Sequence, residues 1–276
     1  MNIPPMLYTV GFRTVLNWMD SNQLLVGGRD ALQRLSPDGS NPTILLTDAN
    51  SIFADPEVCG GGKYIVFAWP YHGDAKDVDI WRINADGSNL LRLTSGKGDT
   101  HPHCWVAGNW VYYMDEAEQT PKRVPWSGGQ GQFPPELKIP HVAEWFGTAF
   151  SSDGKWEAAF VNISDPATKV REPKIILVSN FSSPQPAVRL LPLNPYFSLP
   201  SQFTPDGKFI AYAIDENGVG NIWLQPVDGS PGHALTSFSS EIIREFHWSP
   251  DGKRLAVVRG HFESNEVLFR ESPSPR

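Results

Sequence analysis

The stretch WSPDGKRLAVVRG, residues 248–260, contains the pattern that decides the fold of the chain. It joins an aromatic residue, the turn sequence Ser-Pro-Asp-Gly and an apolar run at residues 255–258. Proline restricts φ at the start of such a turn, aspartate caps its own backbone, and glycine accepts a positive φ. We therefore predict a strand, a tight turn and a second strand here.

The same pattern occurs six times along the chain. FTPDGKFIAYAID (203–215), FSSDGKWEAAFV (150–161) and VCGGGKYIVFA (58–68) are close copies, and WVAGNWVYYM (105–114) and WMDSNQLLVG (18–27) have a shorter turn. The first residues of the six copies, called anchors below, are Trp18, Val58, Trp105, Phe150, Phe203 and Trp248. They are about 46 residues apart, a period typical of β-propeller blades made of four antiparallel strands.

The remainder of each copy predicts two further strands. An Asp-Gly turn follows the third strand, as in NADGS (84–88), and a fourth strand ends in Leu-Thr or a variant, including ELKI (136–139) in the third copy. The sixth copy lacks a fourth strand, but a spare one, Met6-Leu7-Tyr8-Thr9, precedes the first copy. We expect this N-terminal strand to complete the last blade, because closure removes open sheet edges.

The predicted fold is therefore all-β, a single β-propeller domain over residues 1–276. It has six four-stranded antiparallel blades and is closed by the N-terminal strand. The predicted blades are residues 12–48, 52–95, 101–140, 146–192, 199–237 and 244–271 plus 6–10.

Composition excludes several classes of function. The net charge of −7, without a basic stripe, argues against nucleic acid as a partner. No apolar run approaches the roughly 20 residues of a membrane helix, and MNIPPMLYTV at the N-terminus shows no signal-peptide pattern. We expect a monomer, either cytoplasmic or, if the chain is excised from a membrane-anchored receptor, periplasmic or extracellular.

The two cysteines, Cys59 and Cys104, fall at different offsets from their anchors. We therefore interpret both as small buried hydrophobic residues rather than as a disulfide.

The repeated unit resembles the TolB-like, WD40-related propeller repeat over nearly the whole chain. NIWLQPVDG (221–229) and EIIREFHWSPDGKRLAVVRGH (241–261) are also similar to propellers at the C-terminal end of bacterial receptor-like Ser/Thr kinases. The resemblance implies a sensor or protein-interaction module of a bacterial signalling protein. The kinase motifs themselves, a Gly-rich loop, His-Arg-Asp and Asp-Phe-Gly, are absent from the sequence.

Ligand sites are expected on the propeller face that carries the longer loops, and in the central channel. The candidate loop residues are Trp69, Tyr71, His72, His101, His103, His141, Trp145 and Tyr196. The residue directly before an anchor points away from the blade core, so it is expected to line the channel, either to bind a ligand or to hold structural water. The residues at this position are Glu57, Gln202 and His247, with Cys104 and Ala149 as their counterparts.

We predict no catalytic residue and no cofactor, and hence a non-catalytic module that binds a protein, peptide or small molecule. The alternative is a metal-dependent polysaccharide lyase or hydrolase that uses His101, His103 and a channel histidine. It follows from the resemblance, since TolB-like propellers include a metal-dependent lyase of pectic oligosaccharides. A further alternative is that these histidines are ordinary solvated loop residues without a binding role. No Gly-x-Ser-x-Gly hydrolase motif is present in the sequence.

Overall fold

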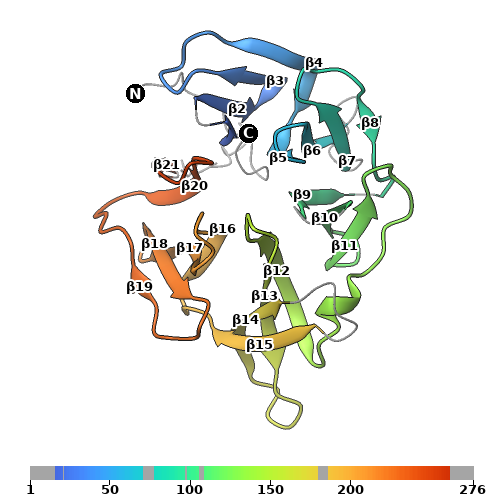
Figure 1. Cartoon of the computed structure of the whole chain (residues 1–276). Helices are drawn as coiled ribbons and strands as arrows, with labels where there is room; N and C mark the ends of the chain where they lie inside the picture. The colour runs from blue at the N-terminus through green and yellow to red at the C-terminus, as the bar shows by residue number, and fades with distance from the viewer. Residues whose placement is uncertain are drawn as a thin grey trace, which may run out of the picture.

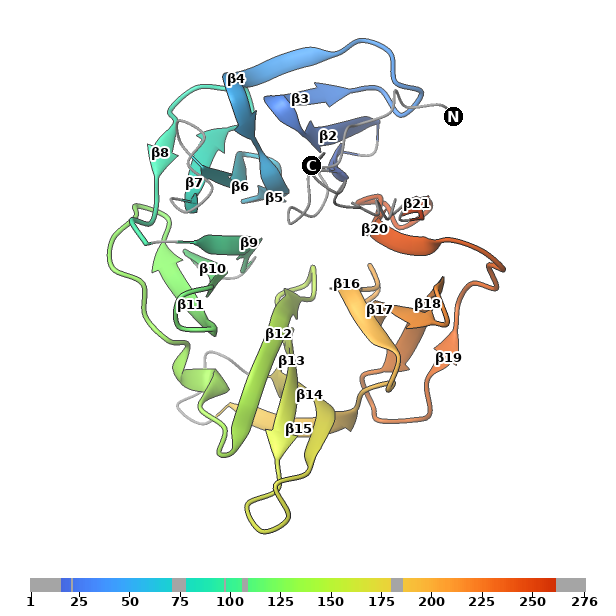
Figure 2. The ribbon, with the colours of Figure 1, turned by 180° about the vertical axis from the view of Figure 1, so that it is seen from behind.

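Six antiparallel sheets stand in a ring around a central opening (Figures 1 and 2). The computed structural model describes residues 16–20, 22–70, 78–96, 98–105, 109–179 and 186–261. The first strand of each sheet in chain order lies innermost, and the later strands follow outward. Within the described residues, no helix is long and apolar enough to cross a membrane.

The first three sheets follow one another along the chain. The first contains β1 (Leu16–Asp20), β2 (Gln23–Gly27), β3 (Arg29–Leu35) and β4 (Thr43–Ile52). The second contains β5 (Ala54–Cys59), β6 (Tyr64–Pro70), β7 (Val78–Asn84) and β8 (Leu91–Arg92). The third contains β9 (Asp99–Cys104), β10 (Trp110–Asp115) and β11 (Thr120–Pro125), followed by a 3₁₀ turn, η2 (Pro135–Leu137).

The last three sheets complete the ring. The fourth contains β12 (Val142–Phe150), β13 (Trp156–Ser164), β14 (Arg171–Ser179) and β15 (Ala187–Pro192). The fifth contains β16 (Phe197–Phe203), β17 (Phe209–Glu216), β18 (Val219–Pro226) and β19 (His233–Ala234). The sixth contains β20 (Ile242–Trp248) and β21 (Leu255–Gly260).

The repeated turn owes its shape to a hydroxyl group. Ser249 Oγ donates a hydrogen bond to Asp251 Oδ1 at 2.6 Å and accepts one from the Arg254 amide at 2.9 Å. Gly252 completes the turn at a φ of 68°. The same two bonds recur at Ser151 and Thr204. The sequence pattern therefore marks the hairpin between the first two strands of a sheet.

The hydrophobic core is divided among the contacts between neighbouring sheets. In one cluster, Leu25 and Leu32 of the first sheet pack against Ile65 and Phe67 of the second, all fully buried. Similar clusters join the second sheet to the third, the fourth to the fifth, and the fifth to β20. The ring is thus held by the apolar faces of adjacent sheets.

The prediction of six four-stranded blades closed by an N-terminal strand is wrong. The structure has five blades of three or four strands, and the last position in the ring holds only the hairpin β20–β21. In the described part of the chain no further strand pairs with this hairpin, and the predicted closing segment, 6–9, lies outside the described residues. The turn motif specifies the two inner strands of a copy and carries no information on the outer ones.

Side-chain packing brings the two ends of the ring together. The indole Nε1 of Trp18 donates a hydrogen bond to the His247 carbonyl at 3.0 Å. Ala256 and Val258 of β21 pack against the apolar cluster of the first sheet. Contact between the first sheet and the hairpin therefore closes the described ring.

The segment ELKI was also predicted incorrectly as a strand. Residues 135–137 form the turn η2 instead, and Leu137 is fully buried. Pro134 and Pro135 have no amide hydrogen and a restricted φ, so they cannot contribute to a β ladder here. This explains why the third sheet has three strands.

Candidate functional site: the central channel

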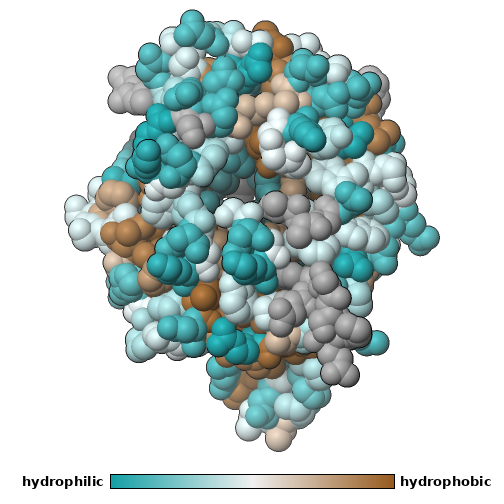
Figure 3. Space-filling view, viewed as in Figure 1, coloured by the Kyte–Doolittle hydropathy of each residue, from teal (hydrophilic) through white to brown (hydrophobic). Residues whose placement is uncertain are grey.

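A cavity of about 80 Å³ lies in the channel and is lined by a short piece of each innermost strand. Figure 3 shows hydrophilic residues around the central hollow. The lining residues are Leu16 and Asn17 of β1, Asp55–Glu57 of β5, His101–His103 of β9, Phe146–Thr148 of β12, Leu199–Ser201 of β16, and Glu245–His247 of β20. Every blade therefore contributes to one site.

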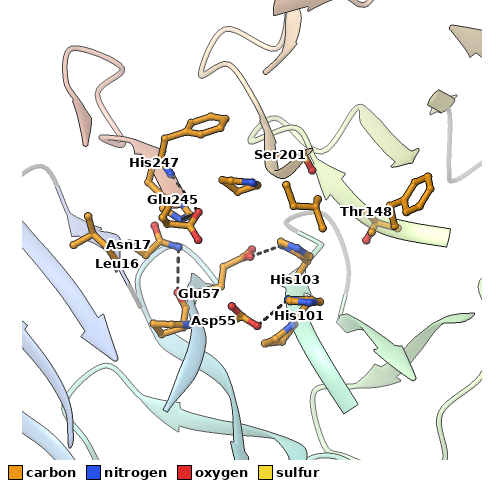
Figure 4. Close-up of a pocket in the computed structure, with 17 residues that line it drawn as sticks. Leu16, Asn17, Asp55, Glu57, His101, His103, Thr148, Ser201, Glu245 and His247 are labelled. Carbon is orange, nitrogen blue, oxygen red and sulfur yellow. Dashed lines mark hydrogen bonds and ion pairs between the residues drawn. The ribbon is translucent and has the colours of Figure 1, made fainter. Parts of the chain in front are cut away.

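Three of these pieces carry two ionisable side chains each, two residues apart. They read Asp-Pro-Glu in β5, His-Pro-His in β9 and Glu-Phe-His in β20. Both members of each pair reach the cavity (Figure 4). In β20 this follows from strand alternation, because Glu245 and His247 are two apart in continuous register. Asp55 and His101 instead lie at β-bulges and have positive φ values of 47° and 51°.

The six groups form three histidine–carboxylate pairs. His101 Nδ1 lies 2.8 Å from Asp55 Oδ2, and His103 Nδ1 lies 2.7 Å from Glu57 Oε2, so these two pairs join β9 to β5 (Figure 4). His247 Nε2 lies 3.0 Å from Glu245 Oε1 within β20. Each carboxylate orients one imidazole through this contact.

His103 shows the electrostatic effect most clearly. Burial by itself lowers the pKa of this imidazole, but the hydrogen-bonded Glu57 carboxylate, with Asp55 and Glu245 further away, raises it. The net pKa lies above the ordinary value for histidine. The site is therefore an acidic environment that favours positive charge.

Among the described lining residues, the ionisable groups lie on one side of the channel. The pieces of β12 and β16 contribute apolar, glycine and hydroxyl residues to the cavity, namely Phe146, Gly147, Thr148, Leu199, Pro200 and Ser201. Neither lysine nor arginine is among the described lining residues. We call Asp55, Glu57, His101, His103, Glu245 and His247 together the charged side of the channel.

Strand register corrects one predicted equivalence. Cys104 pairs with Val111, as the anchor Val58 pairs with Ile65. Cys104 therefore stands at the anchor position, and His103 stands at the channel position that sequence comparison had assigned to Cys104. The error arose because the aromatic residue of the third copy, Trp105, lies one position beyond the structural anchor.

The position before the anchor also connects neighbouring blades. Glu57 Oε1 accepts a hydrogen bond from the Cys104 amide at 3.0 Å, and Asn17 Nδ2 donates to the Pro56 carbonyl at 3.3 Å. Gln202 Nε2 donates to the Phe246 carbonyl at 2.5 Å, and Gln202 is not among the cavity-lining residues. This position therefore joins each of these innermost strands to the next one around the ring.

Cys59 and Cys104 form a disulfide between the second and third sheets, so their interpretation as two separate hydrophobic residues is wrong. Both are buried, and their Cα atoms are 5.8 Å apart, a normal distance for a disulfide. Even after the register correction, Cys104 stands at the anchor position and Cys59 one residue after the anchor Val58, so unequal offsets do not exclude pairing between neighbouring sheets.

The remaining candidate residues lie elsewhere. Trp69 is only 3% exposed, stacks on Phe53 and donates to Ser51 Oγ at 2.8 Å, so it belongs to the core. His141, Trp145 and Tyr196 do not line the cavity, and the Trp145 ring packs against Phe133. Tyr71 and His72 lie outside the described residues.

Two acidic residues of the site, Asp55 and Glu245, were missed in the sequence. Both stand two positions before a predicted channel residue on the same strand, at Glu57 and His247. Strand alternation is the signal that could have identified Glu245. Asp55 lies at a β-bulge with a φ of 47°, so alternation alone does not predict its direction.

The distances between possible ligand atoms test the predicted metal site. In the described part of the chain, one group of three ligand atoms lies within 4.8 Å of one another, and it consists of Glu57, Cys59 and Cys104. The three channel histidines do not form such a group. A three-histidine metal centre thus has no converged ligand set among the described residues.

Comparison with known proteins places the chain in a structural class. No family model matches it. A stretch of 51 residues is 43% identical to the putative tricorn protease homolog 2 of Streptomyces coelicolor, and one of 59 residues is 34% identical to dipeptidyl aminopeptidase BIII of Pseudoxanthomonas mexicana. These matches cover 18% and 21% of this chain but only 4% and 9% of the relatives, so the chain spans less than a tenth of their length.

Solved structures resemble the whole ring. The putative TolB from Agrobacterium tumefaciens has a TM-score of 0.64 at 18% identity, over 93% of this chain and 92% of the other. TolB from Acinetobacter baumannii scores 0.62 at 17% identity, over 82% and 54%. An oligogalacturonate lyase in complex with manganese scores 0.62 at 10% identity, over 85% and 69%. The fold is that of a TolB-like β-propeller, while the similarity to kinase propellers stays a prediction.

Proposed function

We propose that the chain is a non-catalytic binding module of the TolB-like propeller class, and that its channel binds a positively charged group of a peptide or small molecule. The observation that supports this proposal is the charged side of the channel. Three carboxylates from β5 and β20 reach one cavity whose described lining contains no lysine or arginine.

The size and chemistry of the cavity agree with such a ligand. A volume of about 80 Å³ suits an amine or guanidinium group rather than a whole folded partner. A bound cation donates charge-assisted hydrogen bonds to these carboxylates in exchange for its hydrogen bonds to water. The apolar residues on the opposite side, such as Phe146 and Leu199, offer contacts to the carbon skeleton of the ligand.

Calorimetric titration tests the proposal with matched probes. Arginine amide and a dipeptide amide with a free N-terminus are expected to bind, whereas the N-acetylated dipeptide amide is expected to bind at least tenfold more weakly. Glu245→Gln should weaken binding about tenfold, the usual effect of losing a charged hydrogen-bond partner. Glu216→Gln, an exposed position at the end of β17, is the control and should leave binding unchanged. Equal binding of the acetylated probe, or no effect of Glu245→Gln, would refute the proposal.

A metal-dependent lyase is the second candidate function. His101 and His103 each contact a carboxylate through Nδ1, which leaves Nε2 available, and metal-bound histidines in proteins commonly have this arrangement. A manganese-dependent loss of oligogalacturonate, abolished by His101→Gln, would support this function over binding. Absence of metal uptake and cleavage by the purified chain would reject it.

A further inference from the structure

Two sulfur atoms and a carboxylate oxygen meet at the junction of the second and third sheets. The ligand atoms of Glu57, Cys59 and Cys104 all lie within 4.8 Å of one another. Both cysteines are buried, at 3% and 4% exposure, on the innermost strands β5 and β9. The cluster is therefore a compact set of donors between two blades.

The position of the carboxylate is determined by the backbone. Glu57 Oε1 accepts the amide hydrogen of Cys104 at 3.0 Å, so the carboxylate lies beside the second sulfur. Glu57 Oε2 contacts His103 Nδ1 at 2.7 Å. Neither interaction involves a sulfur atom, since one partner is a backbone amide and the other an imidazole.

Reduction changes what this cluster can bind. A thiol reductant breaks the S–S bond, supplies two electrons and two protons to form two cysteine thiols, and is itself oxidised to a disulfide. Two thiolates and one carboxylate are a donor set that suits Zn²⁺, with a fourth position left for water. The thiol protons leave when the metal binds.

We propose that the reduced chain binds one zinc ion through Cys59, Cys104 and Glu57. The junction is then joined by a disulfide under oxidising conditions and by a metal under reducing conditions. Because Glu57 also pairs with His103, zinc at this position changes one of the three histidine–carboxylate pairs of the channel. The inference is independent of the ligand proposed for the channel.

The test uses the full chain, oxidised or reduced with an excess of dithiothreitol that is then removed without oxygen. We expect the reduced chain to retain about one zinc per molecule, measured by elemental analysis after desalting, and the oxidised chain to retain less than a tenth of that. Cobalt added to the reduced chain should produce a thiolate-to-metal charge-transfer band in the near ultraviolet. Cys59→Ser and Cys104→Ser should each abolish the band.

Two variants that keep both cysteines test the zinc site while the disulfide can still form, so loss of folding does not confuse the result. Glu57→Gln should weaken zinc binding at least tenfold, whereas Asp55→Asn, two residues away on the same strand, should change it less than twofold. Zinc retention by the oxidised chain, no cobalt band in the reduced one, or equal affinities in the two carboxylate variants would overturn the assignment.

Discussion

Two junctions of the ring contain buried or half-buried acids in opposite circumstances. At the junction of the second and third sheets, both Glu57 oxygens have partners, and a disulfide crosses nearby. At the junction of the third and fourth sheets, Glu157 is completely buried, and within the described structure neither of its oxygens has a hydrogen-bond partner. The same repeated framework thus holds one acid with partners on both oxygens and the other without a hydrogen-bond partner.

Glu157 replaces an apolar residue of the repeat. It pairs with the anchor Phe150, just as Ile65 and Ile210 pair with their anchors Val58 and Phe203. Burial, together with the nearby Glu136 carboxylate, raises the pKa of Glu157 well above its ordinary value, and Arg123 only partly offsets this. At one junction the carboxylate has partners on both oxygens, whereas at the other the burial that raises the pKa of Glu157 favours its protonated form.

Removing the disulfide between Cys59 and Cys104 should have the largest effect on the free energy of unfolding. The cysteines are 45 residues apart, and the chain-entropy relation gives about 4 kcal/mol for a loop of this length. Cys59→Ser combined with Cys104→Ser should lower the free energy of unfolding by about this amount, measured in urea without added metal. The wild-type chain under reducing, metal-free conditions should match the double variant. A loss below about 1 kcal/mol would show that the disulfide adds little to this junction.

Replacing the buried acid should strengthen the other junction. Glu157→Leu is expected to raise the free energy of unfolding by about 2 kcal/mol at alkaline pH, because the ionised carboxylate has no partner. The folded pKa lies above the unfolded one, so the native state binds more protons between them and wild-type stability falls as pH rises through this interval.

Unfolding measured as a function of pH checks this reasoning. Glu157→Leu should remove the fall in stability above the unfolded pKa. Glu157→Gln, which cannot ionise, should also remove it but with a smaller gain. An unchanged pH dependence in both variants would mean that Glu157 is ionised in the native state.

Removing the pair between His103 and Glu57 should have the smallest effect on the free energy of unfolding. The folded pKa of His103 is raised, so its stabilising contribution is complete below the unfolded pKa and is lost as pH rises through the folded value. His103→Gln should therefore cost less than about 1 kcal/mol near pH 6 and nothing at high pH, since the pair borders the channel. The NMR titration midpoint of His103 should exceed the ordinary value of about 6.5. A midpoint below that value would contradict the pairing. His141→Gln, at an exposed position, is the control for the stability measurement.

Much of the ring could be predicted from the sequence because its signals are local. The hydroxyl, aspartate and glycine of each turn bond within a few residues, as Ser249 and Asp251 do. Glu57, His103 and His247 were recognised as candidates, and the structure brings them to one cavity. The third sheet was harder, because its anchor is Cys104 and its fourth strand is replaced by η2.

The pairings across blades could not be predicted. Whether Cys59 meets Cys104, or Asp55 meets His101, depends on how neighbouring innermost strands are aligned, and no local pattern encodes this alignment. A shift of one residue reverses which side chains face the channel. The polar partners of the site therefore became visible only in the folded ring.

The hydrogen bonds along the inner rim have a mechanical consequence. Asn17, Glu57, Gln202 and Trp18 each fasten one innermost strand to its neighbour, whereas the corresponding residue of the fourth sheet, Ala149, has no polar side chain to do so. A ring of strands joined by side-chain hydrogen bonds at most of its junctions is expected to open first at a junction that lacks such a bond. Transient opening of the propeller should therefore begin beside β12, whose sheet also contains Glu157, a buried acid without a hydrogen-bond partner in the described structure.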